Sequence, residues 1–274
     1  MSTAYGTDYQ INRKSGVTYF GLGGTPYEPT LDPDATVVTE VGCGEGTRAI
    51  SAQKTVAINP KLSWTMNVRN LSDYILPNAM PALEGVVPSH DLAVRIGTEY
   101  HLFTGCKVNT CKVTIRQKET VKAAIEVLAK GRSAGASWTF IKSTDAAMWK
   151  DSLTTLSIGG TPVTNWSEAE FGIDNKVQQE SLGVDIMPTE MGEREAMYTG
   201  YILRAISGTT LVPDVIAGTT KTMVYALRDN ATTPVTKTFT FANATLKTSR
   251  VNVRGLEMVM ERIEWQAKTL VVTP

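Results

Sequence analysis

A glycine cluster after a predicted strand is the first feature of this sequence that could do chemistry. Residues 37–41 are rich in Val and Thr, and residues 42–46 follow as Gly-Cys-Gly-Glu-Gly. Closely spaced glycines after a strand let the backbone approach a nucleotide cofactor, as in an S-adenosylmethionine-dependent methyltransferase. That class also needs a crossover helix and a second parallel strand ending in a carboxylate. Only residues 47–54 could form the helix, and the next strand ends at Asn59-Pro60 without an acid, so the sequence disfavours this enzyme.

Other catalytic residue types occur in patterns that do not predict an active site. Residues 89–91 are Ser-His-Asp, but consecutive residues do not place their side chains in a relay, so a turn or helix cap is expected. The carboxylate pairs Glu168/Glu170 and Glu261/Glu264 are expected on solvated strand faces. We therefore expect no enzymatic activity, no catalytic residue and no cofactor.

The cysteines and histidines do not predict a metal centre or a disulfide framework. The chain has three cysteines and two histidines, too few for a Cys/His cluster unless most of them meet in one place. Cys106 and Cys111 are five residues apart, which on one uninterrupted strand puts them on opposite faces. Buried, unreactive thiols are the expected role.

Composition excludes several classes of protein. The 274 residues contain 27 Lys and Arg and 27 Asp and Glu, a net charge of zero, which disfavours tight binding to nucleic acid. Hydrophobic residues make up 42%, and no apolar run reaches the roughly 20 residues of a membrane span. The first residues do not resemble a secretory signal, so we expect synthesis in a cytoplasm.

Most of the chain has the hydrophobic period of β-strands. Cys111, Val113 and Ile115 alternate with polar residues, and residues 121–129 alternate in the same way, although a helix is also possible there. The glycines of residues 157–162 predict a tight hairpin turn. Further strands are expected at residues 35–41, 57–68, 100–107, 152–158, 166–177, 196–206, 222–227, 236–241 and 256–268.

Helical signals are few and short. We expect short helices at residues 72–76, ending before Pro77, at residues 144–150, and near residues 213–217 before Gly218. The predicted fold is mainly β, a sandwich or barrel with one or two short peripheral helices. Residues 1–34 are rich in Gly, Pro, Thr and Tyr and are expected to form an extended N-terminal arm. Residues 35–274 are expected to form a single β-rich domain.

Several segments, taken in order, resemble the tail tube proteins, or major tail proteins, of long-tailed phages and related viruses. The most characteristic is residues 100–115, which resembles an aromatic–x–Gly–x–Lys–Val strand pair of that family. The arm of residues 1–34 and the segment of residues 132–150 are longer than a minimal family member needs. The glycine cluster then has a non-catalytic explanation. The remaining similar segments are residues 40–48, 62–68, 71–85, 171–177 and 256–272.

The resemblance implies a structural virion protein assembled in the host cytoplasm. Its homo-hexameric rings would stack into a hollow tail tube through which viral double-stranded DNA passes into the host. Other tail proteins, such as a terminator, a baseplate or a tape measure protein, are implied as partners, and DNA is implied only as passing cargo. Another β-rich ring or assembly module, such as a secretion-tube-like protein, a baseplate component or an adhesin, remains an alternative. The methyltransferase is less favoured.

Two groups of contact residues follow from this reading. A basic row lining the lumen would retard DNA, so the polar residues of the second group are expected to face another subunit or solvent. Contacts between rings are expected from Tyr5, Tyr9, Tyr19, Phe20 and Tyr27 in the arm. Contacts within the sheet and ring are expected from Phe103, Lys112, Val113, Thr114 and Arg116. The sequence leaves open the host, the tail type and which face lines the lumen.

Overall fold

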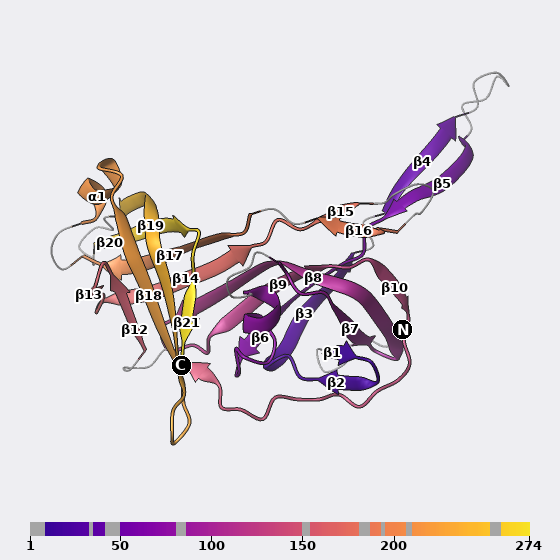
Figure 1. The fold of residues 1–274 in the computed structure, drawn as a ribbon, viewed down its shortest axis with the longest axis horizontal. Helices are drawn as coiled ribbons and strands as arrows, with labels where there is room; N and C mark the ends of the chain where they lie inside the picture. Colours follow the sequence, from indigo (N-terminus) through magenta and orange to yellow (C-terminus); the bar gives the residue numbers. More distant parts are fainter. Residues whose placement is uncertain are drawn as a thin grey trace.

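The fold is described by a computed structural model that covers residues 9–32, 35–41, 50–80, 86–149, 154–180, 187–192, 195–206, 210–252 and 259–274. The chain is mainly β with two short helices, which confirms the predicted fold class. Figure 1 shows two β-rich halves side by side and a hairpin that projects away from the first half.

The first half contains the strands up to β10 and one short helix. They are β1 (Tyr9–Ser15), β2 (Thr18–Phe20), β3 (Gly24–Asp32), β4 (Ala35–Val41), β5 (Ile50–Ile58), β6 (Lys61–Val68), the one-turn helix η1 (Ile75–Ala79), β7 (His90–Ile96), β8 (Glu99–Arg116), β9 (Lys122–Leu128) and β10 (Gly131–Ala134).

The rest of the chain contains the strands of the second half, a small hairpin (residues 178–180 and 190–192) that lies beside the first half, and one α-helix. They are β11 (Met148–Trp149), β12 (Thr155–Ile158), β13 (Thr161–Pro162), β14 (Trp166–Asp174), β15 (Gln178–Glu180), β16 (Glu190–Gly192), β17 (Met197–Ala205), α1 (Val212–Ile216), β18 (Thr220–Asp229), β19 (Thr236–Asn252), β20 (Met260–Ala267) and β21 (Val271–Thr273).

Strand β8 joins the two halves. Its N-terminal part pairs with β7 and β10, and its C-terminal part pairs with β9 and with β14 of the second half. A continuous antiparallel sheet therefore runs from β3 through β6, β9, β8, β14, β17, β20, β19 and β18 to β12. Most of the buried hydrophobic side chains among the described residues form one cluster that extends through both halves.

Irregularities in β8 correct the prediction that Cys106 and Cys111 point to opposite faces. The register against β9 shifts between Val108 and Thr110, which marks a β-bulge. One extra residue reverses the alternation, so Val108 and Cys111 are both fully buried. Burial raises the pKa of Cys111 to about 12, as expected for an unreactive thiol.

Several local predictions are confirmed. Residues 122–128 form a strand, and the charges on one parity of the pattern lie on its less buried face. The hairpin between β12 and β13 turns at Gly159 and Gly160, whose φ angles are +58° and +81°. Both angles are those of a type I′ turn, which glycine adopts without strain.

The helix predictions need correction. Residues 144–149 do not form a helix, since Met148 and Trp149 pair with β18 as strand β11. Pro77 does not end the first helix but lies within η1. A proline is tolerated in a first helical turn, because the N–H that it lacks would have no acceptor within the helix. The helix near Pro213 is present as α1, with the proline in its first turn.

The prediction that residues 1–34 lack regular structure is wrong for residues 9–32. Strand β1 pairs with β7, β2 pairs with β1, and β3 pairs with β6. Strand β3 tolerates Pro26 because it pairs on one side only among the described residues, and an edge strand needs no donor on its free side. Ile11 and Leu22 are buried in the main core. Residues 1–8 lie outside the described residues.

Candidate assembly surfaces

The hairpin of β4 and β5 projects away from the rest of the described fold (Figure 1). The two strands pair antiparallel from Ala35 opposite Ile58 to Val41 opposite Ile50. They form a separate two-stranded sheet that pairs with no other described strand, and they extend well beyond the body of the molecule (Figure 1). An element of this shape can reach a neighbouring molecule without changing the fold beneath it.

The same hairpin removes the structural basis for the methyltransferase reading. A dinucleotide-type site needs a parallel strand reached through a crossover helix. Here residues 50–54, considered above as helix, belong to a strand antiparallel to β4. The glycines at residues 42–46 lie outside the described residues.

Of the aromatic residues expected to make contacts from the N-terminal arm, the two with described side chains both contact their own chain. Tyr19 stacks on Trp138 of the same chain, with ring centroids 5.7 Å apart. Phe20 is 37% exposed and lies under the guanidinium of Arg13. Tyr9 and Tyr27 belong to β1 and β3, but their side chains lie outside the described residues, as does the whole of Tyr5.

The residues predicted on β8 separate into buried and surface groups. Phe103 and Val113 are buried in the core of their own chain. Lys112 is exposed, Thr114 is half-buried and Arg116 is exposed, all on the opposite face of the strand. The alternation predicted from the sequence is therefore present, and the apolar members stabilise the sheet from within.

Acidic side chains of β14 compensate the polar row on β8. The Arg116 guanidinium lies 3.1 Å from the Glu168 carboxylate, and the Thr114 hydroxyl donates to Glu170 at 3.2 Å. These contacts follow from the ladder, because Glu168 is opposite Arg116 and Glu170 is opposite Thr114. The hydrogen bond and charge of Glu168 raise the pKa of Arg116.

The compensation continues across the sheet to β17 and β20. Tyr201 donates to Glu168, and the Arg262 guanidinium lies 3.6 Å from the centre of the Tyr201 ring. Burial, followed by the contact with Glu168, raises the pKa of Tyr201 to about 12. Hydrogen bonds from Arg262 and then Thr248 lower the pKa of Glu264. The result is a face on which Arg116 pairs with Glu168 and Arg262 pairs with Glu264.

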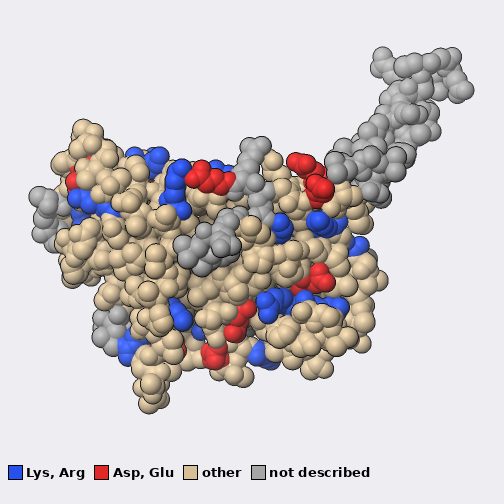
Figure 2. Space-filling model, in the orientation of Figure 1, with Lys and Arg blue, Asp and Glu red and all other residues tan. Residues whose placement is uncertain are grey.

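A shallow groove on the same side of the sheet is lined by polar and small side chains of β6, β8 and β9. Glu126 lies 2.7 Å from both the Lys61 ammonium and the Asn109 amide. Burial acts to raise the pKa of Glu126, but these two hydrogen bonds lower it overall. Lys112 also lines the groove. Figure 2 likewise shows Lys and Arg interspersed with Asp and Glu, without a large patch of one sign on the visible face.

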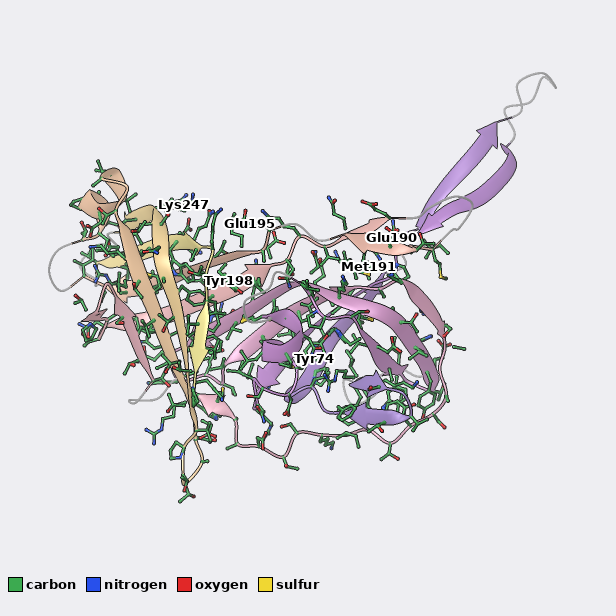
Figure 3. All side chains as sticks on the ribbon, in the orientation of Figure 1. Tyr74, Glu190, Met191, Glu195, Tyr198 and Lys247 are labelled. Atoms are coloured by element: carbon green, nitrogen blue, oxygen red, sulfur yellow. The ribbon has the colours of Figure 1, made fainter. Side chains whose placement is uncertain are left out.

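The small hairpin β15–β16 lies at the base of the projecting hairpin in Figure 1. The Gln179 amide donates to the Ala129 carbonyl at 2.7 Å, and Met191 packs with Val87 and Val177 in a small separate cluster. Figure 3 shows Glu190 and Met191 there, Glu195, Tyr198 and Lys247 on the second half, and Tyr74 inside the first half. The small hairpin is thus attached to the first half by both polar and apolar contacts.

The described residues contain no candidate metal centre and no candidate membrane-spanning helix. No group of three or more His, Cys, Asp or Glu residues there is arranged to hold a metal ion. Among the helices of that same part of the chain, none has the length and apolar character needed to cross a bilayer. The predicted carboxylate pair Glu261/Glu264 is split, because Glu261 is buried against Arg204 while Glu264 lies on the polar face.

Comparison with known proteins supports an assembly role. A search of curated proteins found no match. The family model described as phage tail tube protein matches residues 3–267, which is nearly the whole chain. The chain therefore belongs to the phage tail tube protein family, a family of structural tail components.

Proposed function

We propose that the protein forms homo-hexameric rings that stack into a hollow tail tube, and that viral double-stranded DNA passes through this tube into the host. The observation that carries the proposal is the family match over residues 3–267, together with a hairpin that pairs with no other strand among the described residues. Assembly in the host cytoplasm, and contact with a terminator, a baseplate or a tape measure protein, belong to the same proposal. No enzymatic step is part of it.

The projecting hairpin supports contact between rings. A two-stranded hairpin alone is at best marginally stable in water, so one that extends from a folded body gains stability when a partner covers it. We assign the main ring-to-ring connection to β4 and β5. The predicted contacts of Tyr5, Tyr9, Tyr19, Phe20 and Tyr27 remain part of the proposal, although stacking on Trp138 already uses one face of Tyr19.

The charge-compensated face supports a tube that does not bind DNA tightly. Affinity for DNA grows with the number of cations that neutralise phosphates, and Arg116 is already paired with Glu168. We therefore keep the proposal that Lys112, Thr114 and Arg116 face another subunit or solvent. Strand β8, whose Phe103 and Val113 side chains are buried in the core, would belong to the sheet that lines the tube.

Electron microscopy of the purified protein over a concentration series tests this function. The proposal predicts rings with six subunits at low concentration and hollow tubes at high concentration. A protein that stays monomeric at all concentrations, including after addition of preformed tail tips as an initiator, would contradict it.

A further inference from the structure

Asn12 is a fully buried polar residue in a place where a strand would normally face solvent. It follows Ile11 in β1, and both residues are 0% exposed. Successive side chains of a strand point to opposite faces. Ile11 enters the core, so a second layer must cover Asn12 on the other side.

That layer is a strap formed by residues 135–147, which connects β10 to β11 and contains no strand. Figure 1 shows it running along one side of the first half toward the second half. The side-chain Oδ1 of Asn12 accepts hydrogen bonds from the Trp138 indole N–H and the Ile141 backbone N–H, both at 3.0 Å. The Asn12 amide donates to the backbone carbonyls of Ile141 at 2.9 Å and Phe20 at 3.0 Å.

These four bonds use the full capacity of one amide side chain and connect the β1–β2 hairpin to the strap, which is more than 100 residues away in sequence. Trp138 adds an aromatic contact, since it stacks on Tyr19 and meets the edge of Tyr100 at 5.2 Å. Gly21 also lies beside the strap, since a Cβ there would be in ordinary van der Waals contact with the Ile141 carbonyl, 3.6 Å away. The strap and the β1–β2 hairpin therefore share one set of contacts centred on Asn12.

We propose that Asn12 is a latch that makes the strap and the β1–β2 hairpin open and close as one unit, independently of the rest of the fold. The latch also keeps an edge of β7 covered, because β7 pairs with β1 on one side and β8 on the other. An uncovered strand edge is a template for irregular pairing with a second copy of the chain. The device would thus limit strand exchange between molecules, and it does not depend on tube formation.

Hydrogen exchange of the full-length Asn12→Ala variant tests the coupling. Loss of the amide leaves buried donors and acceptors without partners, so opening of the unit becomes easier. We expect amides of β1, β2 and Ile141 to exchange about tenfold faster or more, while amides of β20 keep the wild-type rate. Faster exchange in the strap alone, an unchanged pattern, or faster exchange throughout the protein would each overturn the latch.

A matched control and a milder variant keep the test decisive. Asn175 is also a buried amide, donating to the carbonyls of Ala79 and Val108. The Asn175→Ala variant should not open the strap and hairpin selectively, and the latch is overturned if it does. If Asn12→Ala does not fold, Trp138→Phe keeps a stacked ring but removes one bond to Asn12, and it should give the same pattern with a smaller increase.

Light scattering tests the role of the β7 edge. Solutions of Asn12→Ala should form irregular aggregates several-fold faster than wild type, because the edge is exposed more often. Equal aggregation rates, in a variant whose strap and hairpin exchange faster, would overturn this part of the inference.

Discussion

The two hairpins near the start of the chain have opposite relations to the rest of the molecule. The β1–β2 hairpin pairs with β7 through one strand and is fixed by the strap through Asn12. The β4–β5 hairpin pairs with no other described strand and projects into solvent (Figure 1). Both have the strand pairing of a sheet, so secondary structure alone does not distinguish an internal element from one suited to a partner.

The difference separates an element that stabilises the fold from an element that is available for contact with other molecules. The β1–β2 hairpin is stabilised by core burial, ladder bonds and a saturated buried amide, and its contribution is to the fold. The β4–β5 hairpin pairs with no other described strand, and we propose that it contributes through contacts with other molecules. Variants in the two hairpins should therefore separate stability from assembly.

Deletion of residues 35–58 should have the largest effect, and it should affect assembly alone. Asp32 is opposite Lys61 in the ladder between β3 and β6, so residues 33, 34, 59 and 60 would remain as a four-residue hairpin connection. We expect no stacked tubes by electron microscopy, with thermal unfolding close to that of the wild type. Tubes of normal length would show that the β4–β5 hairpin is not needed for stacking. A large loss of stability would show that it stabilises the fold, as the β1–β2 hairpin does.

Ile11→Ala should have the next largest effect, on stability. Ile11 is fully buried, and truncation of such a side chain costs about 2–5 kcal/mol. Val17, in the turn of the same hairpin, is 92% exposed, so Val17→Ala should change stability by less than about 0.5 kcal/mol. Urea unfolding measures both. Equal costs would show that the β1–β2 hairpin is not integrated into the core.

His90, the first residue of β7, should make the stability of the protein depend on pH. Burial, despite a bond to the Pro88 carbonyl, lowers the pKa of His90 from 6.5 to about 4, and its Nε2 accepts from the Tyr74 hydroxyl. The unfolded state takes up the proton first, so stability is full above pH 6.5 and falls toward pH 4, by about 3 kcal/mol. The difference between wild type and His90→Gln in urea unfolding should show this loss, and a constant difference would contradict it.

The smallest effect is expected on the polar face. Arg116 is about half exposed in its pair with Glu168, so Arg116→Ala should cost less than about 1 kcal/mol, and less at high salt. A double-mutant cycle with Glu168→Gln isolates the pair. A coupling of several kcal/mol would mean that this face supports the fold as strongly as the β1–β2 hairpin does.

Local patterns predicted the elements whose stability is local. Alternation in residues 122–128 and paired glycines at Gly159 and Gly160 led directly to β9 and the β12–β13 turn. The N-terminal strands were missed because Pro26 and nearby glycines are turn signals that an edge strand also accepts. The long strand β8 was read as two because its bulge interrupts the period.

The tertiary contacts had no local signal. Asn12 and Ile141 are 129 residues apart, and nothing near either residue indicates the bond. The polar residues of β8 were predicted, but their acidic partners depend on which strand lies beside β8. The family likeness was detectable because it rests on the order of many weak patterns along the chain, whereas the projection of β4 and β5 is visible only in the fold.

Helical reconstruction of the assembled tube by cryo-electron microscopy tests the central claim most directly. The account predicts six copies in each ring, with β4 and β5 of every copy lying against a subunit of the adjacent ring and β1–β2 remaining paired with β7 of its own chain. A tube in which the β4–β5 hairpin contacts no other subunit, or in which β1 and β2 alone supply the connection between rings, would contradict it.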